Sequence, residues 1–174
     1  MQNIKKVLSF KYKLIVVSSL LLFLSSLDQL TKYLAVINLQ GQKPIIFFQG
    51  IFQLVYAENP GAFLGMGGNW SHQTRFIIFA VVVFLGLGGM LWFLFKRENS
   101  RMNLIAYSFI LSGGFGNLWD RVFHSNGHVV DFLFIDFGGP FRTGVFNLAD
   151  VEIVVGVLLL LLKEHCFDRR TINV

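Results

Sequence analysis

The chain has 174 residues, of which 54% are hydrophobic and only 14% charged, with 20 phenylalanines and a mean hydropathy of +0.61. This composition excludes an ordinary soluble domain and predicts an integral membrane protein. We assign the net charge of +5 to membrane topology and anionic lipid, because the sequence lacks the basic and aromatic pattern of a nucleic-acid module.

Four apolar segments predict membrane-spanning helices, at residues 14–37, 75–95, 102–122 and 145–162. Each is close to the roughly 20 residues that a helix needs to cross about 30 Å of hydrocarbon. The first segment is expected to be retained, because no small-x-small cleavage site follows it and Asp28 and Lys32 continue it. The predicted fold is therefore an all-α integral membrane protein with four transmembrane helices.

The basic residues set the expected orientation. Ten of the 15 Lys and Arg precede the first segment, lie between the second and third, or follow the fourth. By the positive-inside rule, both termini are predicted to be cytoplasmic. Between the first two segments, residues 44–64 contain β-branched and aromatic residues bounded by Gly and Pro, which predicts a small β-cradle on the outer surface. We expect one compact domain spanning residues 1–174.

Polar residues gather at the outer ends of these helices. Asp28 and Lys32 share a face of the first helix at i and i+4. The third helix ends in Asn117, Asp120 and Arg121, the fourth begins with Asn147 and Asp150, and Asp131 lies in the loop that joins them. Except for Glu152, one turn further along, every carboxylate inside a segment or at its outer end is at one depth, and such intramembrane charges by default indicate function.

Purely structural roles remain open for each group. Asp28 and Lys32 can form a structural ion pair, and Asp120 with Arg121 can fix the end of the third helix. Asn147 can cap the fourth helix with Asp150 at its third position, beside the positive end of the helix dipole. Close helix packing accounts equally well for the glycines at positions 113, 114 and 116.

The convergence of two carboxylates favours catalysis. Asp150 at a helix N-terminus is expected to be ionised, and Asp131, near that charge and near lipid, to be protonated. Such a pair suits attack of an activated water on an amide, without a metal or cofactor. Ser112 as nucleophile with Lys32 as base is a weaker alternative, since Asp28 one turn away favours the charged form of the lysine. A zinc site is also disfavoured, because the four histidines lack a pair of zinc ligands on a helix.

The motifs in chain order resemble those of the lipoprotein signal peptidases, the type II signal peptidases of bacterial inner membranes. They are DQLTK at 28–32, NPGAF at 59–63, GNLWDR at 116–121, VVDF at 129–132 and FNLAD at 146–150. Each is weak alone, but five in order on four segments are specific. The resemblance implies four helices with a β-cradle, and an aspartyl endopeptidase that removes the signal peptide of diacylglyceryl-modified prolipoproteins just before the lipidated cysteine.

The resemblance also assigns residues. It implies that Asp131 and Asp150 are catalytic, that Asp28 and Lys32 are mainly structural, and that no metal or cofactor is needed. The partners implied are prolipoprotein substrates and membrane lipid, with the chain a monomer in the bacterial cytoplasmic (inner) membrane and its site at the outer leaflet. The supporting polar or substrate-binding positions are Asn59, Gly61, Asn117, Asp120, Arg121 and Asn147.

Three further possibilities follow from the sequence. A small four-helix transporter or proton-coupled carrier is the alternative function, although it predicts acids distributed through the membrane depth. Arg121 or Arg142 is a candidate contact for a headgroup phosphate. Gly67 and Gly68 are candidate hinges of a cradle that closes over substrate.

Overall fold

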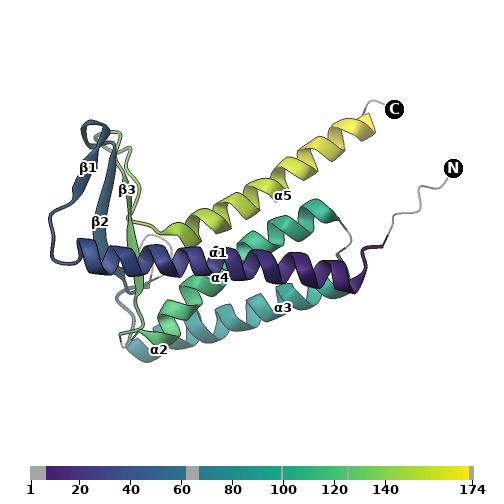
Figure 1. The fold of residues 1–174 in the computed structure, drawn as a ribbon, viewed down its shortest axis with the longest axis horizontal. Coiled ribbons are helices and arrows are strands. Elements are labelled where there is room, and N and C mark those ends of the chain that lie inside the picture. The colour runs from purple at the N-terminus through teal and green to yellow at the C-terminus, as the bar shows by residue number, and fades with distance from the viewer. Residues whose placement is uncertain (1–6, 62–66, 99, 125, 173–174) are drawn as a thin grey trace.

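A computed structural model describes residues 7–61, 67–98, 100–124 and 126–172, with side-chain detail as far as residue 165. Four long helical stretches run side by side, and a small sheet lies across one end of them (Figure 1). The helical elements are α1 (Phe10–Leu39), α2 (His72–Phe76), the π-helical η3 (Ile77–Val82), α3 (Val83–Lys96), α4 (Arg101–Phe123) and α5 (Leu148–Ile172).

These helices cover the four predicted segments, with one shift in a boundary. The fourth helix begins at Leu148 instead of residue 145, because Phe146 forms a β-bridge with Leu133 before the helix starts. In the described part of the chain, Phe10–Leu39 and Gln73–Lys96 are long and apolar enough to cross a membrane. The helices α4 and α5 carry more small and polar residues, so membrane crossing by all four stays a prediction.

The helix α4 packs between α1, α3 and α5, and most extensively against α5. Glycines make this approach close. A Cβ at Gly113 would collide with the carbonyl oxygen of Ala149 and lie 2.9 Å from Ile153 Cγ1, and a Cβ at Gly156 would lie 2.6 Å from the Ala106 carbonyl oxygen. The helix-packing interpretation of Gly113 is therefore confirmed.

We expect Gly113→Ala to lower the free energy of unfolding by about 1–3 kcal/mol, because the backbones of α4 and α5 must separate to admit the methyl group. Gly88→Ala in α3 is the matched control, since nothing lies within 4 Å of a Cβ there. That control is expected to be neutral or slightly stabilising. Thermal unfolding in detergent checks both, and equal stability of the two variants would contradict the packing account.

The sheet has three antiparallel strands in the order β1-β2-β3. They are β1 (Ile45–Phe47), β2 (Phe52–Asn59) and β3 (Val129–Ile135), with the short helix η1 (Phe48–Gly50) in the first turn. Strands β1 and β2 confirm the expected cradle strands between residues 44 and 58, and residues 62–64 of the predicted cradle lie outside the described residues. An irregularity between Leu54 and Ala57 places Ala57 opposite Asp131 and Asn59 opposite Val129.

Strand β3 corrects the prediction that Asp131 lies in a loop. Apart from Asp131, the run VVDFLFI consists of apolar residues, most of them β-branched or aromatic, and its first four side chains are buried. Its backbone pairs with β2 on one side and with Phe146 on the other. The strand gives Asp131 a rigid support that a loop would not provide.

Two apolar clusters hold the helices and the sheet together. One joins Val17, Leu94, Leu104 and Leu111 in the half of the bundle far from the sheet, and the other joins Ala35 and Leu39 of α1 to Val130 and Phe132 of β3. Many other large apolar side chains remain exposed on the helices, including Phe84, Leu85 and Trp92. Exposed apolar surface of this extent is expected where a helix faces lipid.

Candidate active site

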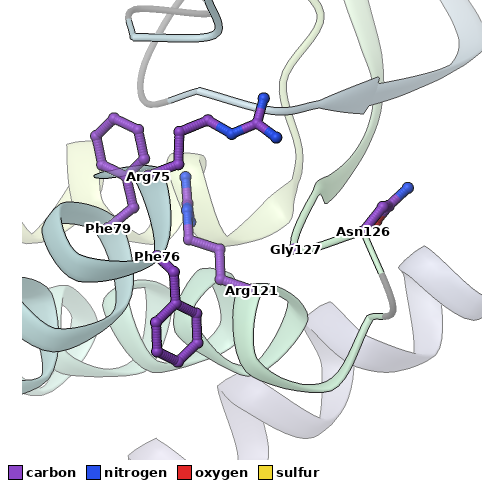
Figure 2. A pocket seen from close by; sticks show the side chains of 6 residues that line it. All are labelled: Arg75, Phe76, Phe79, Arg121, Asn126 and Gly127. Carbon is purple, nitrogen blue, oxygen red and sulfur yellow. The ribbon is translucent and has the colours of Figure 1, made fainter. Parts of the chain in front are cut away.

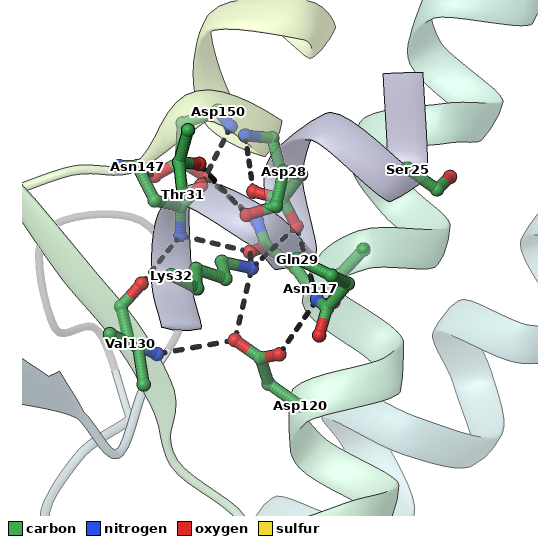
Figure 3. A network of polar contacts seen from close by, with 12 residues as sticks. Ser25, Asp28, Gln29, Thr31, Lys32, Asn117, Asp120, Val130, Asn147 and Asp150 are labelled. Atoms are coloured by element: carbon green, nitrogen blue, oxygen red, sulfur yellow. Dashed lines mark hydrogen bonds and ion pairs between the residues drawn. The ribbon is translucent and has the colours of Figure 1, made fainter. Parts of the chain in front are cut away.

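Polar side chains converge where the sheet meets the helices, and Figure 3 shows those of α1, α4 and the start of α5. The network draws on α1, β2, α4, β3 and the start of α5. Its buried members are Asp28, Lys32, Asp120, Asp131 and Asn147, and the others are partly buried. Buried polar groups are costly unless they are paired. The pairing inside this network therefore decides what each residue does.

Lys32 is the central cation of the network. Its Nζ lies 2.9 Å from Asp28 Oδ2 and 2.9 Å from Asp120 Oδ2, and both aspartates have no exposed surface. The predicted Asp28–Lys32 ion pair is confirmed. Asp28 also accepts a hydrogen bond from the backbone N–H of Ala149 at 3.0 Å, which fixes the first turn of α5 against α1.

The structural alternative in which Asp120 pairs with Arg121 is not seen among the ion pairs of the described residues. Besides Lys32, Asp120 accepts hydrogen bonds from Gln29 Nε2 at 2.9 Å and from the backbone N–H of Val130 at 3.2 Å. Consecutive residues on a helix point about 100° apart, so Asp120 and Arg121 serve different sides of α4. Asp120 links α4 to α1 and to β3 immediately before Asp131.

Arg121 instead holds the segment that follows β2. Its Nη2 donates to the carbonyl oxygen of Gly61 at 2.8 Å, and its Nη1 donates to the carbonyl oxygen of Asn117 at 3.0 Å. The guanidinium lies over the Phe79 ring, 5.5 Å from its centroid, and Figure 2 shows both side chains beside Arg75. Both Nη atoms of Arg121 are therefore engaged within the protein. The side chain of Arg142, the other candidate for a headgroup contact, is exposed.

The proposed hinge at Gly67 is tightly packed. Gly67 has a φ of +75°, and an added Cβ would lie 2.8–2.9 Å from the rings of Trp70 and Phe79. Arg75 Nη1 also donates to the carbonyl oxygen of Gly68 at 3.0 Å. Alanine at Gly67 would strain this turn directly, so that substitution does not test a hinge; residues 65 and 66 lie outside the described residues.

Asp131 is 2% exposed, and two asparagines hold its carboxyl group. Asn59 Nδ2 donates to Oδ2 at 3.0 Å, and Asn147 Nδ2 donates to Oδ1 at 2.7 Å. Asn59 comes from the end of β2 and Asn147 from the residue before α5. The carboxyl group is thus fixed from both sides, with its orientation set by the fold.

Asp150 is held in a similar way at the start of α5. Its Oδ1 accepts from Asn117 Nδ2 at 2.9 Å, and its Oδ2 accepts from the backbone N–H of Asn147 at 3.2 Å. In return, Asn147 Oδ1 accepts from the backbone N–H of Asp150 at 3.0 Å. This reciprocal cap confirms the predicted helix start, and Asn147 thereby contacts both aspartates.

Asp131 and Asp150 line the same cavity, whose volume is about 710 Å³. Its other walls are largely apolar and include Val83, Val151 and Val154, from the helices on either side. Such a cavity combines an apolar wall with a few convergent polar groups, as is usual for a ligand site. Asn59, Asn117, Arg121 and Asn147 also line it, whereas Asp28, Lys32 and Asp120 lie behind it.

Burial and the nearby charge of Asp150 raise the pKa of Asp131, the hydrogen bonds from Asn59 and Asn147 lower it, and the net result is a pKa of about 6. Because the pKa of Asp131 is higher in the folded than in the unfolded protein, its carboxyl group makes its full contribution to stability below about pH 4. This contribution is lost as the pH rises through about 6. The direction agrees with Asp131 as the protonated member of the pair.

We expect Asp131→Asn to gain stability relative to the wild type as the pH rises from 5 to 8, because the variant does not bury a charge. Thermal unfolding of both proteins at the two pH values measures this, with Asp136→Asn on the same segment as the control. A difference in melting temperature that is the same at pH 5 and pH 8 would show that the pKa of Asp131 is not raised.

Glu152 is a buried group whose environment the sequence did not reveal. It is 3% exposed, and among the described residues neither carboxyl oxygen has a hydrogen-bond partner, although the Ser112 side chain is a favourable neighbour. In the sequence, the only sign that Glu152 is unusual is its position two residues after Asp150, inside an apolar run.

Replacing Glu152 with methionine is expected to raise the free energy of unfolding by about 1–3 kcal/mol, the cost of an unsatisfied buried polar group. Methionine keeps the length of the side chain without its polar atoms. Val154→Met on the exposed side of α5 is the matched control and should change little. A destabilised Glu152→Met protein would mean that the carboxyl group has a partner that stabilises the fold.

Two of the described histidines contact other groups of the protein. His128 Nδ1 lies 3.3 Å from Glu58 Oε2, and His124 Nδ1 lies 3.1 Å from the carbonyl oxygen of His128. Within the described residues, no three His, Cys, Asp or Glu side chains are grouped as metal ligands.

Comparison with known proteins gives consistent matches. Residues 20–166 match the family model described as signal peptidase (SPase) II. The lipoprotein signal peptidase of Borreliella afzelii (strain PKo) is 34% identical over 151 residues, covering 84% of this chain and 87% of the relative. That of Clostridium novyi (strain NT) is 35% identical over 142 residues, covering 79% and 91%. A bacterial membrane enzyme structure at 1.9 Å resolution superposes with a TM-score of 0.71 and 26% identity, covering 84% and 90%.

Proposed function

Because the chain belongs to the signal peptidase II family, we propose that Asp131 and Asp150 are the catalytic pair with which it cleaves lipoprotein signal peptides. Members of this family are aspartic-type peptidases, so the chain is a membrane hydrolase that processes lipoproteins. The observation that carries the assignment of the pair is that both carboxyl groups line one cavity and share Asn147 as a hydrogen-bond partner. This peptidase function replaces the transporter alternative.

The proposed substrate is a diacylglyceryl-modified prolipoprotein, cut just before its lipidated cysteine. Its signal peptide is itself an apolar helix, which suits the Val83, Val151 and Val154 walls of the cavity. The lipid would hold the scissile bond at the depth of the headgroups. Asp131 belongs to β3 and Asp150 to the first turn of α5, so both lie at the end of the bundle beside the sheet; the mechanism requires that water and a membrane-bound substrate meet there.

In the proposed mechanism, ionised Asp150 removes a proton from a water molecule that attacks the scissile carbonyl carbon. Protonated Asp131 donates a hydrogen bond to the carbonyl oxygen, where negative charge develops. The tetrahedral intermediate collapses as Asp150 returns its proton to the leaving nitrogen and the C–N bond breaks. The positive end of the α5 dipole favours the charge on Asp150 at the start of this cycle.

The other predicted site residues support this pair. Asn59, Asn117 and Asn147 orient the two carboxyl groups through the hydrogen bonds described above. Arg121 fixes Gly61, and Asp28, Lys32 and Asp120 join α1, α4 and α5 behind the site. With Arg121 engaged, Arg142 at the cavity rim is the proposed contact for a headgroup phosphate.

We place this single domain, a monomer without cofactor, in the bacterial cytoplasmic (inner) membrane with all four helices crossing it. Both termini are then cytoplasmic and the site opens at the outer leaflet. The length of α1 supports this depth: 21 residues separate Lys11 from Lys32, which corresponds to about 32 Å along a helix and matches the hydrocarbon thickness.

The test compares a diacylglyceryl-modified prolipoprotein peptide with the same peptide carrying serine in place of the lipidated cysteine. The purified protein is expected to cleave the lipidated peptide much faster, because the lipid positions the scissile bond. Equal rates would reject the lipid requirement while leaving the peptidase assignment intact. Cleavage of neither peptide would reject the proposed function.

A further inference from the structure

One end of the sheet exposes a group of large apolar side chains that the proposed catalytic site does not use. This cradle tip consists of residues 45–51 and 136–142. Phe48, Phe137 and Phe141 are 77%, 72% and 74% exposed, respectively. Further exposed apolar residues in the cradle tip are Ile45, Ile46, Phe47 and Ile51.

The two segments of the cradle tip lie together. The backbone N–H of Asp136 donates to the carbonyl oxygen of Ile51 at 2.8 Å, which joins the turn after β3 to the turn after β1. Phe137 and Phe141 belong to one tight hairpin, since the N–H of Phe137 donates to the carbonyl oxygen of Phe141 at 2.9 Å. The exposed phenylalanines therefore form one surface that the fold holds in place.

The direction of the sheet places this surface beside the helical bundle. Figure 1 shows the strands running across the direction of the helices, with the turn between β1 and β2 and the far end of β3 extending past α1. Helix α1 ends at Leu39, seven residues after Lys32, which is about 10 Å further along the helix. The cradle tip is thus at the level where lipid headgroups surround the bundle.

Backbone strain also presents Phe48 to the outside. Phe48 and Gln49 have positive φ values of +49° and +58°, a conformation that residues other than glycine seldom adopt. Such strain persists where the surrounding structure imposes it, and it is often associated with function. Here it accompanies the most exposed of the three phenylalanines.

We propose that the cradle tip is an interfacial anchor, which inserts Phe48, Phe137 and Phe141 into the bilayer surface beside the helices. Phe is one of the residues that segments lying in the bilayer interface bury at the boundary between headgroups and acyl chains. Two exposed basic residues suit anionic headgroups: Lys43, which precedes the cradle tip, and Arg142, its last residue. Lipid is the favoured occupant because the end of α1, which packs against the sheet, also exposes the apolar side chains of Leu34 and Ile37, and the inference does not depend on the catalytic assignment.

The test places a spin label at Pro140, between the two phenylalanines of the hairpin. The label is attached to a Pro140→Cys variant in which the single native cysteine is removed by Cys166→Ser. The protein is reconstituted in vesicles of phosphatidylethanolamine and phosphatidylglycerol. Collision rates with oxygen, which concentrates in lipid, and with a water-soluble nickel chelate then report the depth of the label.

The label is expected to favour oxygen over the chelate. In the same labelled protein with Phe137→Ser and Phe141→Ser, the preference should reverse as the hairpin leaves the interface. Both residues are exposed, so the melting temperature should stay the same and exclude misfolding. A label that favours the chelate in both proteins, or one whose depth ignores the two substitutions, would overturn the proposal. Spin–spin broadening that persists after tenfold dilution with lipid would assign the surface to a second copy instead, and would also overturn it.

Discussion

Replacing Asp131 or Asp150 with asparagine is expected to lower kcat for a lipidated prolipoprotein peptide by about 10³- to 10⁴-fold, within the range for loss of general acid or base catalysis. Asparagine keeps the shape of the side chain but cannot exchange a proton. Substrate binding should be retained, because the apolar walls of the cavity are unchanged. Steady-state kinetics together with a binding assay on the same preparations separate the two effects.

The control for this prediction is Asp136→Asn. Asp136 lies five residues beyond Asp131 and forms a backbone bridge with Arg142 at the edge of the sheet. Its kcat should remain close to that of the wild type. If Asp131→Asn or Asp150→Asn kept wild-type turnover, the affected carboxylate would be structural and the proposed mechanism would fail.

The second large effect concerns stability. Lys32→Met is expected to lower the free energy of unfolding by about 3–5 kcal/mol, because it leaves two buried carboxylates, Asp28 and Asp120, without their shared cation. Lys43→Met, at an exposed lysine, is the control and should have little effect. Thermal unfolding in detergent measures both variants.

Adding Asp28→Asn and Asp120→Asn to Lys32→Met should recover part of the lost stability, since the neutral triple variant buries no unpaired charge. A Lys32→Met protein as stable as the Lys43→Met control would show that the network contributes nothing net to folding. A triple variant less stable than Lys32→Met alone would show that hydrogen bonds, and not charge, dominate there.

Much of the site could be predicted from the sequence, because helix periodicity and depth are local properties. The spacing of Asp28 and Lys32 predicts their contact, and the NLAD sequence predicts the reciprocal cap between Asn147 and Asp150. The predicted outer ends of the helices lie at one depth in the membrane, so the polar residues at those ends are predicted to lie at one level. These features need no knowledge of how distant segments pair.

The remaining parts depend on contacts between distant segments. Strand β3 pairs with β2, from which it is separated by two helical segments, so the sequence alone did not distinguish Asp131 on a strand from Asp131 in a loop. The partner of Asp120 is Lys32 on another helix, and proximity in sequence to Arg121 was misleading. Glu152 lies two residues after Asp150 in an apolar run, and this position alone does not predict that its carboxyl group is buried.

The most direct test of the account is to identify by mass spectrometry the bond that the purified protein cuts in a diacylglyceryl-modified prolipoprotein. The account predicts one cut immediately before the lipidated cysteine by the wild type, and none by folded Asp131→Asn or Asp150→Asn proteins. Cleavage at another bond, or the same cleavage by both variants, would contradict it.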